Sequence, residues 1–204
     1  TYQAAMGKQA MGIYASTYQK RFDSSGNILT YCQKPLVTTK SAQVLGQNEM
    51  PAGFNAIVAC LCDEGYNQED STQWNKCSIE RGMGRSTTYM TMSASTVTRG
   101  SGYHNFKRPK ASDTVHMRDE HLYTCLDDDG LPPPNTAIKQ GQAVVGRVTV
   151  PREVMPHGKA PLLPEPVLKP RDASLFNKKS SGVVDETVVF QNDQGGRTAK
   201  VRVR

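Results

Sequence analysis

The stretch GYNQED, residues 65–70, ends in two adjacent carboxylates, Glu69 and Asp70, and follows the most apolar run of the chain. That run, AIVACLC at residues 56–62, is short, uncharged and contains β-branched residues, which is typical of a strand buried on both faces. A loop at the end of a buried strand is a rigid place to mount chemistry. Carboxylate oxygens are hard ligands that suit Mg²⁺. Taken alone, the pair is a weak signal for a magnesium-binding loop, because most Asp and Glu side chains in proteins are simply solvated.

Length and charge set broad limits on this protein. The 204 residues are enough for one good core or two small ones. A net charge of +6 modestly favours a polyanionic partner such as nucleic acid. No apolar run approaches the length of a membrane span, so we expect no membrane partner. The chain starts without Met and stops within what reads as a strand, so we expect a fragment of a longer polypeptide.

The cysteines give no metal-ligand pattern. Their number is odd and no Cys-x-x-Cys pair occurs among Cys32, Cys60, Cys62, Cys77 and Cys125. A zinc site needs about four well-placed ligands, and the four histidines do not complete one at a usual spacing. We therefore expect buried, reduced thiols, no zinc within this segment, and a reducing compartment.

Local patterns predict a chain of short elements. Short helices are expected within residues 1–22 and over residues 39–45 and 75–81. Strands are expected at residues 28–31, 86–92, 142–150 and 183–190.

Loops and turns separate these elements. Residues 151–170 hold six prolines and predict an extended surface loop. Three consecutive acids, residues 127–129, could suggest a metal site, but the Gly and Pro that follow favour a solvated turn. Residues 193–196 predict a hairpin turn into the last strand.

The last strand carries a row of cations. Lys200, Arg202 and Arg204 lie two residues apart and so share one face of the strand. Such a row could follow a phosphate backbone. It could equally protect an edge strand from pairing with another chain. The pattern alone leaves both interpretations open.

Seven sequence blocks together resemble one protein family. In chain order they are TYQAAMGKQAMG at 1–12, QKPL at 33–36, PAGFNAIVA at 51–59, GYNQEDS at 65–71, SIERG at 78–82, LDDDGL at 126–131 and RDAS at 171–174. Together they resemble the second-largest subunit of multisubunit RNA polymerases, and NQEDS and QKPL look most like the eukaryotic RNA polymerase II version. The chain departs from the family at residues 72–74, which are more polar, and at residues 93–102, which are rich in Ser, Thr and Gly.

The resemblance implies a fold and a division of the chain. The fold class would be α+β and β-rich. Residues 1–85 would form the first part of the hybrid-binding domain, and residues 86–196 a wall or flap-like region. Residues 197–204 would be a strand that returns to the hybrid-binding domain.

The resemblance also implies an activity. The chain would belong to a DNA-directed RNA polymerase, a nucleotidyltransferase active only as an assembled complex, transcribing mRNA in the nucleus. Its partners would be the largest subunit, the other polymerase subunits, template DNA, nascent RNA and ribonucleoside triphosphates.

The resemblance assigns roles to five residues of the chain. Asp70, with Glu69 beside it, matches the position that contacts the second Mg²⁺, shared with the largest subunit and the nucleotide. Tyr2, Lys8 and Gln9 match residues along the RNA strand of the RNA–DNA hybrid.

Two alternatives remain open at the level of sequence. The chain could be a stand-alone basic nucleic-acid-binding module without catalysis. It could also be the equivalent subunit of RNA polymerase I or III, or of a large DNA virus.

Overall fold

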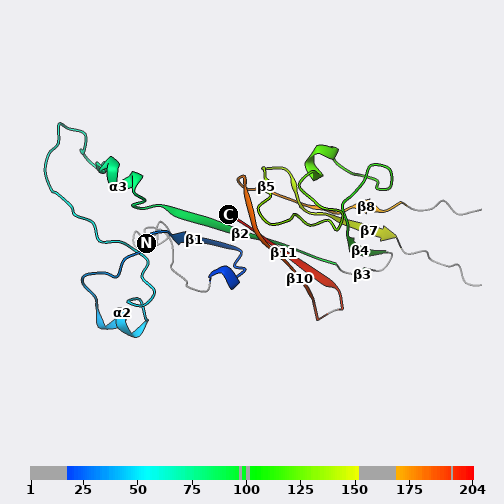
Figure 1. Cartoon of the computed structure of the whole chain (residues 1–204), viewed down its shortest axis with the longest axis horizontal. Helices are drawn as coiled ribbons and strands as arrows, with labels where there is room; N and C mark the ends of the chain where they lie inside the picture. The colour runs from blue at the N-terminus through cyan, green and yellow to red at the C-terminus, as the bar shows by residue number, and fades with distance from the viewer. Residues whose placement is uncertain (1–17, 97, 100–101, 152–168, 194) are drawn as a thin grey trace, which may run out of the picture. The chain divides into compact units, whose positions relative to one another are not determined.

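The computed structural model describes residues 18–96, 98–99, 102–151, 169–193 and 195–204 (Figure 1). Strands predominate and the helices are few and short, which confirms the α+β, β-rich class. Two compact units divide the chain, residues 1–89 and 90–204. The predictions for Tyr2, Lys8 and Gln9, and for most of the proline-rich segment, fall outside the described residues.

From residue 18 to residue 85, the first unit contains four short elements. These are η1 (Tyr18–Lys20), β1 (Ser25–Leu29), α2 (Lys40–Val44) and α3 (Lys76–Glu80). Strand β1 begins at Ser25, three residues before the predicted start at residue 28. In the part of the chain that the structure describes, no helix is long and apolar enough to cross a membrane.

The helices predicted over residues 39–45 and 75–81 are confirmed, and each begins at a side-chain cap. Most of the range 1–22, where another short helix was predicted, lies outside the described residues. The hydroxyl of Thr39 accepts a hydrogen bond from the Ala42 N–H at 3.2 Å, and the amide oxygen of Asn75 accepts one from the Ser78 N–H at 3.0 Å. Such caps satisfy backbone donors that the first helical turn leaves unpaired. Gly82, at φ 105°, follows the end of α3 in a conformation that glycine adopts readily.

The second unit is built almost wholly from strands. They are β3 (Thr98–Arg99), β4 (Gly102–Phe106), β5 (Ala137–Ile138), β6 (Ala143–Val145), β7 (Arg147–Pro151), β8 (Arg171–Asp172), β9 (Leu175–Phe176), β10 (Gly182–Gln191) and β11 (Arg197–Val203), with the short helix η2 (Glu120–Tyr123). Strand β2 (Ser86–Ser95) begins beside β1 in the first unit and continues into the second, where it pairs with β11.

Three sheets organise these strands. The largest has the order β1-β2-β11-β10-β5, a four-stranded sheet has the order β3-β4-β7-β8, and β6 pairs with β9. Strands β10 and β11 form the predicted antiparallel hairpin, closed by the Asn192 N–H donating to the Gly196 carbonyl at 2.8 Å (Figure 1). Because β11 lies between β10 and β2, its interpretation as an edge strand is wrong.

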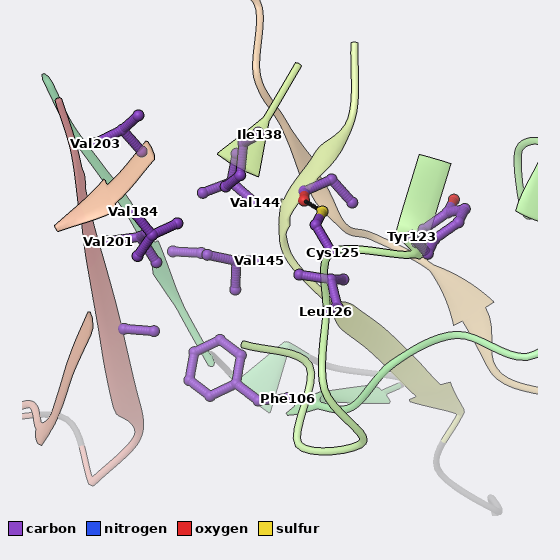
Figure 2. Packing of buried hydrophobic residues seen from close by; sticks show 13 residues of the cluster. Phe106, Tyr123, Cys125, Leu126, Ile138, Val144, Val145, Val184, Val201 and Val203 are labelled. Carbon is purple, nitrogen blue, oxygen red and sulfur yellow. Dashed lines mark hydrogen bonds between the residues drawn. The ribbon is translucent and has the colours of Figure 1, made fainter. Parts of the chain in front are cut away.

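One hydrophobic core fills the second unit (Figure 2). Valines of β10 and β11 face residues of β6 and of the segment after η2 across it. The buried members include Tyr123, Cys125, Leu126, Val145, Val184, Val201 and Val203. Burial raises the pKa of the Cys125 thiol, which donates a hydrogen bond to the Ala143 carbonyl at 2.9 Å. Cys125 is therefore a buried, protonated thiol, as the sequence predicted.

The single strand predicted over residues 142–150 is wrong, because the chain breaks there into β6 and β7. At Gly146 the backbone turns against another segment, and an added Cβ would lie 2.8 Å from the Lys107 carbonyl oxygen. All three residues of β6 are fully buried, so β6 does not alternate in burial as the sequence suggested.

The buried strand predicted over residues 56–62 is also wrong in this structure. Those residues form no regular element and are exposed, with Ile57 fully accessible and Val58 at 77%. A buried strand needs neighbours that pair with its backbone and cover both faces. None of the strands in the described residues pairs with this run. Cys60, Cys62 and Cys77 are exposed as well, so the expectation of buried thiols fails for them.

A network around Tyr123 joins η2 to β8 and β9. The buried Tyr123 hydroxyl donates to the Asp172 carboxylate at 2.6 Å and accepts from the Arg118 N–H at 3.2 Å. Asp172 also accepts from the hydroxyl of Ser174 at 2.6 Å. Burial, and then the bond to Asp172, raises the pKa of Tyr123 to about 12, so the hydroxyl stays protonated at neutral pH. The RDAS motif thus has a structural role here.

Tyr123→Phe is expected to weaken this network by about 1–2 kcal/mol, because the Arg118 N–H loses its acceptor and Asp172 loses a donor. Native-state hydrogen exchange at the amides of η2 and β8 should become about 5- to 30-fold faster. Tyr103→Phe, at a tyrosine 45% exposed, is the matched control and should change nothing. Equal exchange rates in the two variants would contradict the structural role of the Tyr123 hydroxyl.

Candidate active-site loop

The loop that follows the apolar run presents both predicted carboxylates to solvent. Glu69 and Asp70 are exposed, in a turn of the first unit. Glu69 has φ 56°, the left-handed region that a non-glycine residue adopts only under local constraint. Glu64 and Gly65 in the same loop also have positive φ, at 49° and 80°. The loop is therefore tightly turned on both sides of Tyr66.

Hydrogen bonds within the loop hold this shape. The Asn67 side chain donates to the Leu61 carbonyl at 2.6 Å and accepts from the Asp63 N–H at 3.2 Å, so it links the loop's beginning to its middle. The Ser71 hydroxyl, next to Asp70, donates to the carbonyl of Gln68. These bonds order the backbone around the carboxylates and leave the carboxylates themselves exposed.

The segment just before the loop is anchored as well. The Asn55 side chain donates to the Lys34 carbonyl at 2.9 Å and accepts from the Leu36 N–H at 3.2 Å. The Gln33 side chain in turn accepts from the Asn55 N–H at 2.8 Å. Four such hydrogen bonds, the fourth from the Asn55 side chain to the Gln33 amide oxygen at 3.5 Å, thus join the QKPL block to Asn55 just before the apolar run.

Glu69 and Asp70 are chemically suited to a hard cation. Within the described residues neither carboxylate takes part in an ion pair, so both remain available as oxygen ligands. The same part of the chain contains no group of three or more His, Cys, Asp or Glu that could hold a metal ion. The pair therefore fits a Mg²⁺ that takes its other ligands from elsewhere, such as phosphate and water.

Lys200 and Arg202 of β11, and Arg204 just after it, have different surroundings. The Arg202 side chain is 3% exposed and binds Asp185 at 2.6 Å and Glu186 at 3.0 Å. The Lys200 ammonium lies 5.4 Å from the centre of the Phe190 ring. The Arg204 side chain is 47% exposed, and its guanidinium lies 3.9 Å from the Asp185 carboxylate. A guanidinium buried against two carboxylates is already neutralised. The row is therefore not a uniform cationic face.

The triple-aspartate block forms a turn. Residues 127–129 are exposed, the Gly130 N–H donates to the Asp127 carbonyl at 2.9 Å, and the Leu131 N–H donates to the Asp129 carboxylate at 2.9 Å. Gly130, at φ 81°, packs so closely that a Cβ would lie 2.5 Å from the Gly146 carbonyl oxygen. The expected solvated turn is confirmed. Glycine is required at position 130, because the backbone of Gly146 leaves no room for a side chain there.

Comparison with known proteins decides the family. All 204 residues match the family model described as RNA polymerase Rpb2, domain 6. The chain belongs to this family.

Relatives of this Rpb2 domain 6 chain include eukaryotic and archaeal proteins. The chain is 42% identical, over its whole length, to the DNA-directed RNA polymerase II subunit RPB2 of Schizosaccharomyces pombe, and 41% identical to RNA polymerase II subunit 2 of Arabidopsis thaliana. It is 38% identical to the RNA polymerase subunit Rpo2 of Sulfolobus acidocaldarius. The chain spans only 17% of the first two proteins and 18% of the third.

The sequence analysis assigned no role to two aromatic residues, one at each end of the loop that carries Glu69 and Asp70. Phe54 comes just before the apolar run, and Trp74 comes four residues after Asp70. In the structure their rings lie 6.3 Å apart. The departure from the family at residues 72–74 was the one signal that could have drawn attention to Trp74.

Proposed function

We propose that this chain is part of the second-largest subunit of a DNA-directed RNA polymerase II, which transcribes mRNA in the nucleus. The observation that carries the proposal is identity of 40–42% over the whole chain to RNA polymerase II subunits of several eukaryotes. Catalysis belongs to the assembled enzyme, with the largest subunit, template DNA, nascent RNA and ribonucleoside triphosphates as partners. The archaeal relatives share the polymerase role in their names, so the nuclear assignment rests on the eukaryotic ones.

Asp70 is the proposed contact to the Mg²⁺ that accompanies the incoming nucleotide, with Glu69 beside it. Such an ion neutralises negative charge on the phosphate oxygens during nucleotidyl transfer. Asp70 orients the ion and the triphosphate through one exposed carboxylate. A single carboxylate holds the ion loosely enough for release with pyrophosphate, whereas a cage of several would retain it.

We also propose a division of the chain into functional regions. Residues 1–85 form the first part of the hybrid-binding domain, residues 86–196 the wall, and residues 197–204 a strand returning toward the hybrid. Tyr2, Lys8 and Gln9 lie along the RNA strand, where they contact phosphate and sugar and read no base sequence. Lys200 and Arg204 are candidates for the same backbone contacts. Arg202 is left out, because its side chain is only 3% exposed and its charge is engaged by both Asp185 and Glu186, whereas Arg204 is 47% exposed and lies 3.9 Å from Asp185 alone.

Exposed apolar side chains in the first unit support a place inside a larger subunit. Leu36, Val44 and Ile57 are each more than 80% exposed. A soluble monomer rarely leaves so many large apolar groups in water. Since the relatives are about six times longer, we propose that other parts of the subunit cover them.

Lys8→Ala in the assembled polymerase tests the hybrid-binding role. When the logarithm of the affinity of the elongation complex is plotted against the logarithm of the salt concentration, loss of one phosphate contact should reduce the magnitude of the slope by about one. Gln9→Ala removes an uncharged group and should weaken binding without changing that slope. Lys20→Ala, at an exposed lysine of η1, is the matched control. If Lys8→Ala and Lys20→Ala give the same slope as the unmodified enzyme, Lys8 does not contact the hybrid.

A further inference from the structure

Two aromatic rings close the base of the loop that carries Glu69 and Asp70. The Phe54 and Trp74 ring centres lie 6.3 Å apart with the planes at 72°, an edge-to-face contact. This arrangement places the positive edge of one ring against the negative face of the other. The two residues bound a loop of nineteen residues, 55–73, so their contact joins chain segments that are distant in sequence.

Trp74 is held from more than one side. Its indole N–H donates to the Thr72 hydroxyl at 3.2 Å. A Cβ at Gly84 would lie 3.6 Å from the indole ring, so the turn after α3 packs against it. Asn75, the next residue, caps α3. The indole therefore has one orientation relative to the helix that ends the loop, although it is 51% exposed.

The residues between Asp70 and Trp74 make hydrogen bonds within the loop. Gln73 donates from its side chain to the Asp63 carbonyl at 3.3 Å, which joins the returning leg of the loop to the outgoing leg. Ser71 then binds the Gln68 carbonyl through both its N–H, at 3.1 Å, and its hydroxyl. Ser71 and Gln73 thus restrain the backbone on the returning side of the carboxylates.

We propose that Phe54 and Trp74 are positioning residues for the Mg²⁺-binding carboxylates Glu69 and Asp70. The inference rests on the proposed function of this loop. The aromatic contact restrains the two ends of the loop, which lowers the conformational entropy that the loop loses when Asp70 engages the ion and the nucleotide. A carboxylate displaced by as little as an ångström would orient the triphosphate poorly.

The experiment measures nucleotide addition by the assembled polymerase across a Mg²⁺ titration. Trp74→Leu should raise the Mg²⁺ concentration for half-maximal rate by about three- to tenfold. Without the aromatic contact the loop loses more conformational entropy when the ion binds, and this loss weakens Mg²⁺ binding. Phe54→Leu should have a similar effect, and the double variant should be no worse than the stronger single one. Trp74→Phe keeps an aromatic ring at this position and should retain most of the Mg²⁺ affinity of the unmodified enzyme.

Controls separate positioning from general damage. Tyr103→Leu alters an aromatic residue of similar exposure, 45%, in the other unit and should leave the titration unchanged. If Trp74→Leu lowers the rate equally at every Mg²⁺ concentration, the contact is merely structural and the proposal is overturned. If Asp70→Ala shifts the Mg²⁺ dependence and Trp74→Leu does not, positioning fails while the loop's function stands. If neither shifts it, the function proposed for the loop is itself wrong.

Discussion

Asp70→Ala in the assembled polymerase is expected to slow nucleotide addition by roughly a hundredfold at ordinary Mg²⁺ concentrations. The reason is that the variant removes the exposed oxygen ligands that we assign to the ion arriving with the nucleotide. Raising the Mg²⁺ concentration should recover part of the lost rate, since phosphate and water can still bind the ion. Single-nucleotide addition followed by rapid quench over a Mg²⁺ titration measures both effects.

Two further variants sharpen this result. Glu69→Gln keeps the shape of the side chain and removes its charge, so it should have a smaller effect in the same direction. Asp63→Ala removes another exposed carboxylate of the loop and serves as the matched control, because only the backbone groups of Asp63 take part in the loop's hydrogen bonds. An elongation rate unchanged by Asp70→Ala at every Mg²⁺ concentration would refute the assignment of Asp70.

Arg202→Ala is expected to destabilise the β10–β11 hairpin by about 3 kcal/mol. Removing the guanidinium leaves the Asp185 carboxylate, whose side chain is 21% exposed, without its closest partner, and opens a gap at a buried position of β11. Because Glu186 is 45% exposed, its share of the loss is small. Amide exchange along β10 and β11 in the assembled enzyme should become about a hundredfold faster.

Lys200→Ala is the matched comparison on the same strand. Lys200 makes a cation–π contact with Phe190 at 5.4 Å and is only partly buried, so its loss should change exchange by less than about fivefold. If Arg202→Ala and Lys200→Ala had equal effects on exchange, the ion pairs of Arg202 would not be a major source of stability. If Arg202→Ala weakened only hybrid binding, Arg202 would belong to the nucleic-acid interface after all.

Local patterns in the sequence were sufficient to predict several helices and turns. The caps at Thr39 and Asn75 mark the starts of α2 and α3, because a side-chain oxygen satisfies backbone donors within the same few residues. The turn at residues 127–130 and the β10–β11 hairpin were predictable for the same reason. The family was recognisable from short motifs, and the motif with Glu69 and Asp70 identified the loop most relevant to chemistry.

Other features depend on residues far apart in the sequence, and the sequence alone did not reveal them. The spacing of Lys200, Arg202 and Arg204 can be read from the sequence. The two carboxylates that pair with Arg202, however, come from β10. The break at Gly146 arises because the Lys107 backbone lies against it. Burial of the run 56–62 requires covering partners, and the described residues provide none. The sequence by itself therefore determined the family, the short helices and turns and the identity of the acidic pair, all of which rest on local chemistry. Only the tertiary structure decided which cation is neutralised, where the long strand breaks and which aromatic rings close the loop, because each depends on contacts between distant segments.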